Sequence, residues 1–348
     1  RKEHFIEPQI EAQFFYINLR NKLANILIIS PISIAGELIM RGFKKGFEAS
    51  GHSVSFVDVR ELNNAQNYDY VLSYDYGYMV SENAFLNVQK ILSINPKVKL
   101  IHYFADNPSL NYAHSGQIYL KEKFFEFCKL HKNNLELVFW DKKFVKDFKG
   151  VKSSYFPICV DCSVYRDFEL EEKYDITFLG RPLSDERQKI LSAIVKNFPD
   201  KLKIFSYPKH FENSIEGMKR FLNDEEIKKY KKCFCGFVES QEELSKIYNS
   251  SKINLNINLQ GDNSLNYRTF EVLASKGFLL CDKREDIKSL GLENVIVQYE
   301  NEQDLIEKTT HYLACKDERN QIRARARKLV SQHFDIVARA GEILNTVE

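Results

Sequence analysis

The sequence lacks the long hydrophobic run that a membrane-spanning helix requires. Its 348 residues contain no apolar stretch of about 18 residues, and they show no secretory signal pattern. These absences predict a cytoplasmic protein with no integral membrane segment, and peripheral contact with a membrane stays open. The first residue is Arg1 rather than Met, so a trimmed chain and a piece of a longer protein both stay open.

An excess of charge of one sign is also missing. The chain carries 50 Lys and Arg against 48 Asp and Glu, a net charge of +2, so no global field favours nucleic acid. The basic run RARARK, residues 323–328, follows acidic residues at 317 and 318, and we interpret it as a solvated helix face. The composition therefore predicts no nucleic-acid partner.

The common fingerprints of nucleotide and metal binding are absent. The sequence contains neither G-x-G-x-x-G nor G-x4-G-K-[ST], which argues against a dinucleotide fold of the usual type and against a P-loop. No two aspartates are separated by a single residue, so an Asp-x-Asp pair that could bridge a metal ion is missing. We therefore expect no resident cofactor and no metal ion in the reaction.

The cysteines form no regular framework. Their number, seven, is odd, which indicates a reducing compartment. Cys159-x-x-Cys162 has the spacing of half a zinc or redox site, but the only similar pair, Cys233-x-Cys235, has the wrong spacing for a zinc ribbon. The pattern favours buried thiols over a metal site.

What the sequence does contain is two successive series of alternating strands and helices. In the first series, strands are expected at 24–30, 53–59, 68–74, 97–106 and 135–140, and helices at 37–52, 84–94 and 118–131. In the second, strands are expected at 174–180, 202–207, 252–259, 277–281 and 294–299, with helices at 184–198, 240–250 and 266–275. This alternation predicts an α/β protein with two parallel sheets, each covered on both faces.

The length of the chain also favours two domains. The join is expected near residues 156–168, because the second series of strands starts soon after it. We place an N-terminal Rossmann-like domain at 1–158 and a C-terminal one at 159–330. The remaining residues, 331–348, are expected to be mainly helical.

Two segments could hold a diphosphate without a metal ion. FLGRPLSDER ends a strand at Gly180, presents Arg181 and begins a helix, and QGDNSLNYRTFEVL places Gly261 and an Asn-rich loop before a helix that carries Arg268. A helix N-terminus and one or two fixed cations are what a bound phosphate requires. Glu271 lies one turn beyond Arg268 and could accept hydrogen bonds from a ribose diol.

Each candidate also has a purely structural interpretation. Arg181 before Pro182 is typical of a surface turn, and Arg268 with Glu271 has the spacing of an ordinary surface ion pair. Asp106, which precedes Asn107 and Pro108, could simply form a turn. His102 lies within a predicted strand and could be a core histidine with satisfied hydrogen bonds.

From Tyr174 to the C-terminus, about half of the chain, the sequence resembles the CgeB-like (spore-maturation-protein-type) glycosyltransferases, which have the GT-B fold of two Rossmann-like domains. The resemblance rests on the segments FLGRPLSDERQKIL, SKINLNIN, NYRTFEVLASKGFLLCD, LIEKTTHYLACKDER and ARARKLVSQHF. In the first half, YFADNP (103–108) is similar to the Asp-x-Pro segment of that family.

The resemblance implies that a nucleoside-diphosphate sugar, with a UDP-sugar favoured, binds mainly to the C-terminal domain in the cleft between domains. It implies that Arg181 and Arg268 neutralise the diphosphate. Asn266 and Tyr267, which directly precede Arg268, are implied to belong to the same donor-binding site. Glu271 resembles the second Glu of an E-x7-E motif, which contacts ribose. The first Glu of that motif falls on Asn263, a departure that leaves the stereochemistry open.

The resemblance also implies a last helix, about 331–347, that crosses back onto the N-terminal domain. If the reaction inverts the sugar, a base must take the acceptor proton, and Asp106 or His102 is placed for that role. The prediction is a cytoplasmic, metal-independent glycosyltransferase with a cell-surface glycan or a protein as acceptor. The alternatives are a catalytically silent GT-B-like protein that binds sugar nucleotide or assembles a surface layer, and a sugar-nucleotide epimerase of the same architecture.

Overall fold

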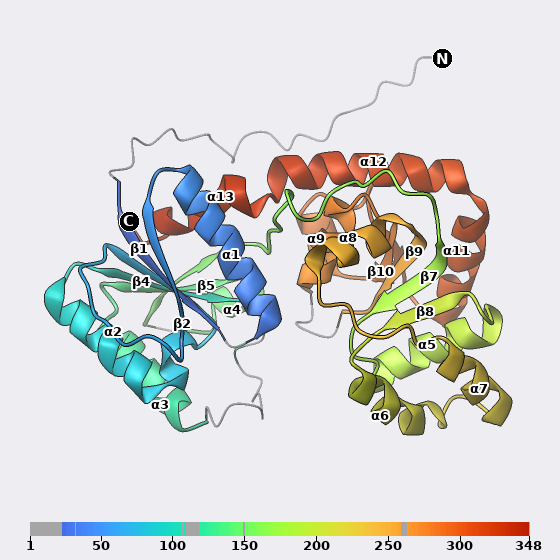
Figure 1. The fold of residues 1–348 in the computed structure, drawn as a ribbon, viewed down its shortest axis with the longest axis horizontal. Coiled ribbons are helices and arrows are strands. Elements are labelled where there is room, and N and C mark those ends of the chain that lie inside the picture. Colours follow the sequence, from blue (N-terminus) through green and yellow to red (C-terminus); the bar gives the residue numbers. More distant parts are fainter. Residues whose placement is uncertain are drawn as a thin grey trace, which may run out of the picture.

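Two α/β lobes lie side by side in the computed structural model (Figure 1). The structure describes residues 23–31, 33–105, 108, 118–148, 150–258 and 263–347. Each lobe holds one sheet whose strands pair in parallel, with helices packed around it (Figure 1). The prediction of two successive parallel α/β units is confirmed.

The N-terminal sheet has the strand order β2-β1-β3-β4-β5-β6. Its strands are β1 (Asn25–Ser30), β2 (Ser53–Asp58), β3 (Tyr70–Tyr74), β4 (Lys99–Phe104), β5 (Leu135–Phe139) and β6 (Lys152–Tyr155). Strands β1 (NILIIS) and β5 (LELVF) are mostly apolar, and all of their residues except Asn25 are buried, as is typical of the strands of a parallel sheet. Strand β6 was not predicted, because its sequence KSSY has no apolar pattern.

Short helices cover this sheet. They are α1 (Ile34–Ala49), the 3-10 turn η1 (Gly77–Val80), α2 (Glu82–Ile94), α3 (Ile118–Leu130) and α4 (Lys142–Val145). Ser33 and Ser81 cap the N-termini of α1 and α2 through their side-chain oxygens, which satisfies backbone donors that have no partner inside the helix.

The C-terminal sheet has the order β11-β10-β9-β7-β8. Its strands are β7 (Tyr174–Leu179), β8 (Leu202–Phe205), β9 (Ser251–Asn256), β10 (Leu279–Asp282) and β11 (Val297–Tyr299). Its helices are α5 (Asp185–Asn197), α6 (Pro208–Met218), α7 (Asp224–Lys232), α8 (Gln241–Asn249), α9 (Tyr267–Ala274), α10 (Glu285–Ser289), α11 (Glu302–Ala314) and α12 (Lys316–His333). Strand β8 lies on one side of β7 in the sheet, and β9 lies on its other side. The direction in which strands are added to the sheet therefore reverses between β7 and β9.

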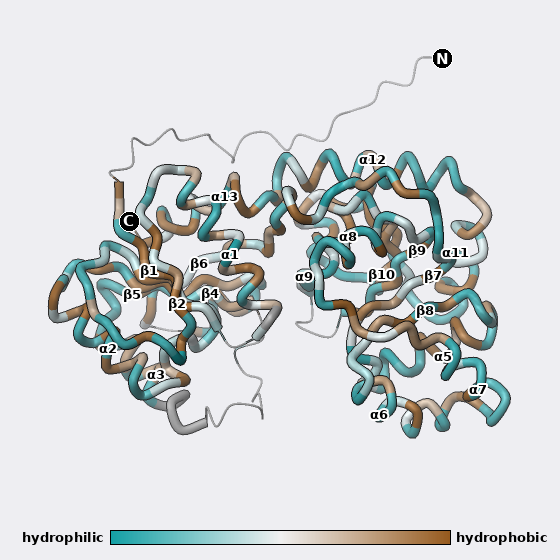
Figure 2. The backbone as a smooth tube through the Cα atoms, viewed as in Figure 1, coloured by the Kyte–Doolittle hydropathy of each residue, from teal (hydrophilic) through white to brown (hydrophobic). Residues whose placement is uncertain are grey.

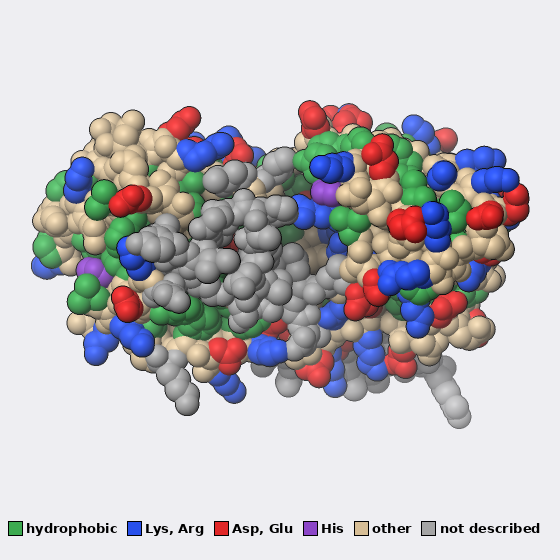
Figure 3. Space-filling view, turned by 90° about the horizontal axis from the view of Figure 1, so that it is seen from below, with side chains coloured by type: hydrophobic (Ala, Val, Ile, Leu, Met, Phe, Trp, Pro, Cys, Tyr) green, Lys and Arg blue, Asp and Glu red, His purple; other side chains and the backbone are tan. Residues whose placement is uncertain are grey.

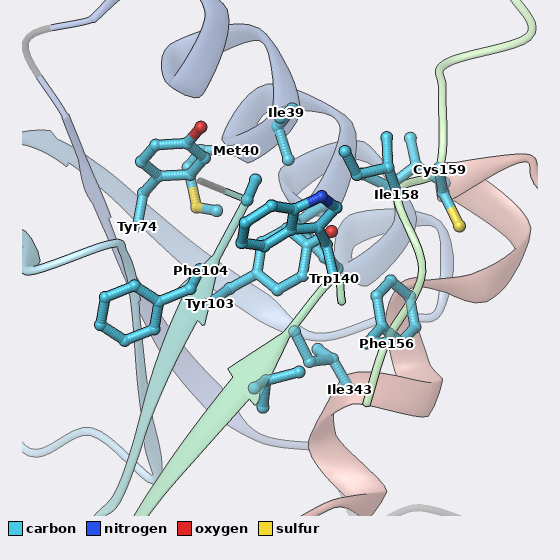
Figure 4. Packing of buried hydrophobic residues seen from close by; sticks show 14 of the residues in the cluster. Ile39, Met40, Tyr74, Tyr103, Phe104, Trp140, Phe156, Ile158, Cys159 and Ile343 are labelled. Carbon is cyan, nitrogen blue, oxygen red and sulfur yellow. The ribbon is translucent and has the colours of Figure 1, made fainter. Parts of the chain in front are cut away.

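Hydrophobic residues fill the interior of both lobes. Figure 2 shows brown, hydrophobic strands inside each lobe and teal, hydrophilic stretches on outer helices such as α7 and α12. Around Trp140, side chains from several elements pack together, among them Met40 of α1 and Tyr103 of β4 (Figure 4). Ile343, near the end of the chain, lies in the same cluster (Figure 4). The C-terminal residues are therefore part of the N-terminal core.

The last helix, α13 (Ile336–Asn345), packs against α1 of the N-terminal lobe. This confirms the predicted crossing back, although α12 continues through residue 330, where we placed the end of the second domain. Two glycines of α1 make the close approach possible. A β-carbon at Gly42 would lie 2.4 Å from Ile336 Cγ2, and one at Gly46 would lie 2.4 Å from Ala340 Cβ.

Helix α12 carries a stripe of three arginines, two of which belong to the segment 323–328 that we interpreted as a solvated face. Arg319, Arg323 and Arg327 are spaced four residues apart, so they share one face. The first two bind Glu172, with Nη2 of Arg319 2.7 Å from Oε2. Arg327 donates to the backbone oxygens of Tyr165, at 3.1 Å, and Ala274, at 2.8 Å. The interpretation as a solvated face was wrong for Arg323 and Arg327, whereas Arg325 and Lys328 are exposed. The arginine stripe binds the segment between the sheets to the C-terminal lobe.

Candidate functional site

The candidate site lies where β7 and β9 end side by side in the C-terminal sheet. In open α/β sheets, ligands bind outside the carboxyl ends of the strands at the point where the strand order reverses. Gly180 follows β7 and Asn258 follows soon after β9, while α5 and α9 begin nearby in the chain. Topology therefore brings together both segments that the sequence analysis selected.

Gly180 has a backbone conformation that other residues rarely adopt. Its φ is +143°, and its amide donates to the carbonyl of Phe205 in the next strand at 3.0 Å. A β-carbon at this position would lie 3.3 Å from Nη1 of Arg268. The Arg268 guanidinium therefore lies against the backbone of the residue that follows β7. These two residues are 88 positions apart in the chain.

A second guanidinium, which the sequence analysis did not select, lies in the same place. Arg187, in the first turns of α5, donates to the carbonyl oxygens of Arg181 at 3.0 Å and Ile257 at 3.1 Å. Burial, followed by the positive charge of Arg268, lowers the pKa of Arg187 to about 10. Two cations held this close together gain from a bound anion.

Two nitrogen atoms of this pair carry the argument for an anion site. Nε of Arg187 and Nε of Arg268 are both buried, and within the described residues neither has a hydrogen-bond partner. The same holds for Nε of Arg319 and Arg323 in α12, but only the first two atoms lie at the strand reversal. A buried donor without a partner is costly. Negative oxygen atoms, such as those of a phosphate, would be attracted by both guanidinium charges. Arg181 itself is exposed at the turn before α5 and contributes charge at longer range.

Glu271 is buried in α9 and does not pair with Arg268. Its Oε1 accepts a hydrogen bond from the Tyr165 hydroxyl at 2.7 Å, and its Oε2 accepts one from Tyr248 at 2.9 Å. The surface ion pair that was left open as an alternative is therefore not what the structure shows. The carboxylate is held in one orientation by two phenols, from α8 and from the segment between the sheets.

Asparagines join the start of α9 to the end of β9. Asn266 caps α9 by accepting from the Thr269 amide at 3.2 Å, and it also accepts from Nδ2 of Asn256 at 2.9 Å. Asn258 accepts from the Asn266 amide at 3.1 Å and donates to Asp282 at 2.9 Å. Asn254, Asn256 and Asn258 alternate along the strand. The sequence KINLNINL shows this alternation of asparagines, but it did not predict that they bind the start of α9.

The other predicted donor-site residues lie at the same helix start. Asn266 is the cap of α9, so the structure gives it an architectural role there. Tyr267 packs edge-on against Tyr165, with ring centroids 6.3 Å apart. The carbonyl of Asn263 accepts from the Asp286 amide at 3.1 Å. Gly261 lies outside the described residues.

The predicted acceptor-side residues have different outcomes. His102 has no exposed surface, and both of its ring nitrogens have partners: Nδ1 is 3.0 Å from Ser73 Oγ, and Nε2 is 2.8 Å from the Tyr78 hydroxyl. Burial lowers its pKa to about 4. This environment is that of a satisfied core histidine and argues against its role as a base. Asp106 lies outside the described residues, so its role stays a prediction.

An exposed aromatic pair follows β8, next to β7. Tyr207 and Phe237 stack with ring centroids 3.7 Å apart, and each is more than a third exposed. Leu183, after the Gly180 turn, is also exposed. Large apolar side chains that remain in solvent next to a polar site offer a flat surface for a planar group.

The seven cysteines are free thiols in the structure. Cys159 and Cys162 are both buried, and burial raises the pKa of each to about 12. Neither is poised for metal binding, in agreement with the expectation of buried thiols. No described helix is both long enough and apolar enough to cross a membrane.

Comparison with known families and structures identifies the type of domain. Residues 187–345 match a family described as glycosyl transferase-like. This match covers the arginine pair, Glu271 and α12, but it does not single out the CgeB-like group. No curated protein sequence matches the chain.

Several solved structures share the whole fold at low sequence identity. A sucrose-phosphate synthase from Thermosynechococcus elongatus aligns with a TM-score of 0.62 at 11% identity, covering 93% of this chain and 98% of that one. A glycosyltransferase from Rickettsia africae ESF-5 gives 0.63 at 14% identity, covering 93% and 99%. The T4 phage enzyme BGT in complex with UDP-glucose gives 0.57 at 16% identity, covering 92% and 97%. The chain thus has the GT-B fold.

Proposed function

We propose that the chain is a glycosyltransferase that moves a sugar from a UDP-sugar or a related nucleoside-diphosphate sugar to a glycan or protein acceptor, which its GT-B fold and the glycosyl transferase-like match of residues 187–345 support. The observation that carries the choice of donor is the pair of buried, unpartnered Nε atoms of Arg187 and Arg268 at the strand reversal. A diphosphate supplies the oxygen atoms that both nitrogens lack.

The arginine pair suits the chemistry of the leaving group. Breaking the bond between a sugar and a phosphate places negative charge on the departing diphosphate, and donors that are already oriented toward that charge lower the barrier. Arg187 is fixed by two backbone carbonyls, and Arg268 is fixed against Gly180. Neither guanidinium needs to be reorganised when the charge develops.

We propose that Glu271 receives the ribose of the donor. Each of its oxygens accepts one tyrosine hydrogen bond, and a carboxylate has about four acceptor positions, so a ribose diol can add to these bonds. The exposed pair Tyr207 and Phe237 would stack on the nucleobase. UDP is favoured because the structurally similar T4 phage enzyme was solved in complex with UDP-glucose.

The transfer is proposed to need no metal ion, since two fixed arginines supply the positive charge. The same phage enzyme was also solved in complex with UDP and Mn2+, so this part of the proposal needs a direct test. We expect activity to survive EDTA. Loss of activity that added Mg2+ or Mn2+ restores would contradict the metal-free mechanism.

The acceptor is proposed to be a cell-surface glycan or a protein. A structurally similar β-glucosyltransferase is described as a DNA-modifying enzyme, but here the net charge is only +2. On the face shown in Figure 3, acidic and basic side chains are interspersed over the C-terminal lobe on the right, whereas nucleic acid requires a basic surface. A cytoplasmic location, supported by the seven free thiols, remains part of the proposal.

A thermal-shift screen against UDP, GDP, CDP, ADP and dTDP tests the donor site first. Binding to the folded chain raises the melting temperature by mass action. We expect one nucleotide to give a clear shift that is lost in Arg268→Ala and Glu271→Ala. Arg325→Ala is the matched control, because Arg325 is an exposed arginine of α12. No shift with any nucleotide would reject the proposed site.

A second candidate is a silent GT-B-like protein that binds sugar nucleotide without turnover. Two observations favour it: Asn263 occupies the position of the first motif glutamate, and His102 is enclosed in the core. Hydrolysis or transfer from the UDP-sugar that binds would exclude this candidate. Binding without turnover, across a panel of glycan and peptide acceptors, would favour it. In Arg268→Ala, the transferase proposal predicts a larger loss in kcat than in donor affinity.

A further inference from the structure

Three side chains with different ligand chemistry converge where α11 meets α12. His311 lies in the last turn of α11, Cys315 separates the two helices, and Glu318 lies in the first turn of α12. This junction is at the outer end of the C-terminal lobe, away from the N-terminal lobe (Figure 1). The spacing His-x3-Cys-x2-Glu was not recognised as a site in the sequence.

The ligand atoms of these residues are close together. Sγ of Cys315 is 3.7 Å from Nδ1 of His311, and Nε2 of His311 is 2.7 Å from Oε2 of Glu318. One ligand atom from each residue can be chosen so that all lie within 4.8 Å of one another. In a tetrahedral zinc site, sulfur and nitrogen ligands lie about 3.6 Å apart, given the usual bond lengths. The Cys–His pair already has this separation.

We propose that His311, Cys315 and Glu318 bind a divalent ion of the zinc type on the surface of the C-terminal lobe. A thiolate, an imidazole and a carboxylate together suit Zn2+ or Co2+ rather than Mg2+ or Ca2+, which prefer oxygen ligands. Three protein ligands leave a fourth position for water. The two anionic ligands neutralise the charge of the ion.

Nearby hydrogen bonds hold the turn that carries the three ligands. The Tyr312 hydroxyl donates to Oε1 of Glu318 at 3.2 Å, which leaves Oε2 on the side of His311. The Cys315 amide donates to the His311 carbonyl at 3.0 Å, which fixes the break between the helices. The buried Arg319 donates to the carbonyl of Leu313 at 3.3 Å and anchors the same turn. Outer hydrogen bonds of this kind orient the ligands of metal sites.

The alternative is a simple ion pair between His311 and Glu318. Their side chains are 52% and 45% exposed, and an exposed pair contributes little to stability. The His311–Glu318 pair occupies only Nε2, and Nδ1 on the other edge of the imidazole faces the Cys315 sulfur at 3.7 Å. To bind an ion, Glu318 needs only to turn its exposed carboxylate from Nε2 toward the same ion as the thiolate.

A metal ion here would join α11 to α12 and leave the sugar-transfer site untouched. Helix α12 clamps the segment between the sheets through Arg319 and Arg323, so the ion would stabilise the domain as a whole. This inference does not depend on the proposed function, because the ligands lie outside the donor site.

Cobalt titration of the full chain under reducing conditions tests the site. We expect one Co2+ per chain and a thiolate-to-cobalt charge-transfer band, which Zn2+ removes by competition. Cys315→Ser should abolish the band, and His311→Gln should weaken binding at least tenfold. Cys235→Ser is the matched control, because Cys235 is an exposed cysteine elsewhere on the same lobe, and it should bind as the wild type does.

Melting temperatures with and without Zn2+ give a second, independent measurement. We expect Zn2+ to raise the melting temperature of the wild type and of Cys235→Ser, but not that of His311→Gln. A charge-transfer band that persists in Cys315→Ser would overturn the proposal, and so would equal zinc stabilisation of all variants. If Cys315→Ser does not fold, His311→Gln decides, because its side chain is half exposed.

Discussion

The guanidinium of Arg268 lies against the backbone of Gly180, so close that a β-carbon on residue 180 would be 3.3 Å from Nη1. One residue ends β7 and the other begins α9, and together they form one wall of the proposed diphosphate site. The contact requires glycine for two reasons, the limited space and the φ of +143°.

Gly180→Ala should therefore weaken the binding of the nucleoside diphosphate by about tenfold, or about 1.4 kcal/mol, because Arg268 must move. Its backbone strain should also cost about 1 kcal/mol of stability. Gly150→Ala is the matched control, since Gly150 has a φ of +88° and no atom within 4 Å of its β-carbon position. Calorimetric titration with UDP should show normal affinity in the control. Equal affinities in the two variants would contradict the role of this contact.

The two tyrosines that hold Glu271 are expected to position it. Tyr165→Phe removes the hydrogen bond to Oε1 and should weaken UDP binding by about fivefold, or about 1 kcal/mol, because one of the two bonds that orient the carboxylate is lost. In a Glu271→Gln background, the same substitution should have little further effect, because the carboxylate that it orients is gone.

A matched variant separates this effect from general loss of stability. Tyr230→Phe removes another buried tyrosine bond, that to Ser214 at 2.6 Å, and should leave UDP affinity unchanged. If Tyr165→Phe has the same effect with and without Glu271, the tyrosine acts independently of that carboxylate.

Packing between α1 and α13 should depend on the glycines of α1. A β-carbon at Gly46 would lie 2.6 Å from the Val337 carbonyl oxygen, and backbone cannot move aside as a flexible side chain can. Gly46→Ala should therefore lower the free energy of unfolding by about 1–3 kcal/mol. Gly341→Ala, on α13, has open space around its β-carbon position and should be neutral or slightly stabilising. Urea unfolding distinguishes the two, and similar stabilities would show that α13 tolerates displacement.

His102 should make the protein less stable in acid. Its pKa is about 4 in the folded chain and about 6.5 when unfolded. The unfolded state therefore binds the proton first, and stability falls as the pH drops from about 6.5 toward 4, by up to about 3 kcal/mol.

His102→Gln removes this titration. The stability difference between wild type and variant should be largest at pH 7 and should shrink by pH 4.5, as measured by urea unfolding across that range. A constant difference would show that the histidine is not held neutral. Retained turnover in the variant at pH 7 would separately confirm that His102 is not the base.

Local pattern predicted most of the elements but not the arrangement of the site. Ser184, Ser240 and Asn266 are caps that can be recognised in the sequence, and they begin α5, α8 and α9. Arg187 was missed because it lies in an ordinary helical stripe, and only its burial beside Arg268 marks it. Strand β6 was missed because its polar residues follow no strand pattern.

The sequence by itself determined two α/β units, a C-terminal half of glycosyltransferase type, and the glycine and arginine segments at the ends of β7 and before α9. Local periodicity and capping carry that information, since each depends on residues a few positions apart. Only the tertiary structure decided that Glu271 binds two tyrosines, that one stripe of arginines on α12 faces inward and that His102 is enclosed. These depend on contacts between residues far apart in the chain, and a single sequence does not specify which distant partners meet.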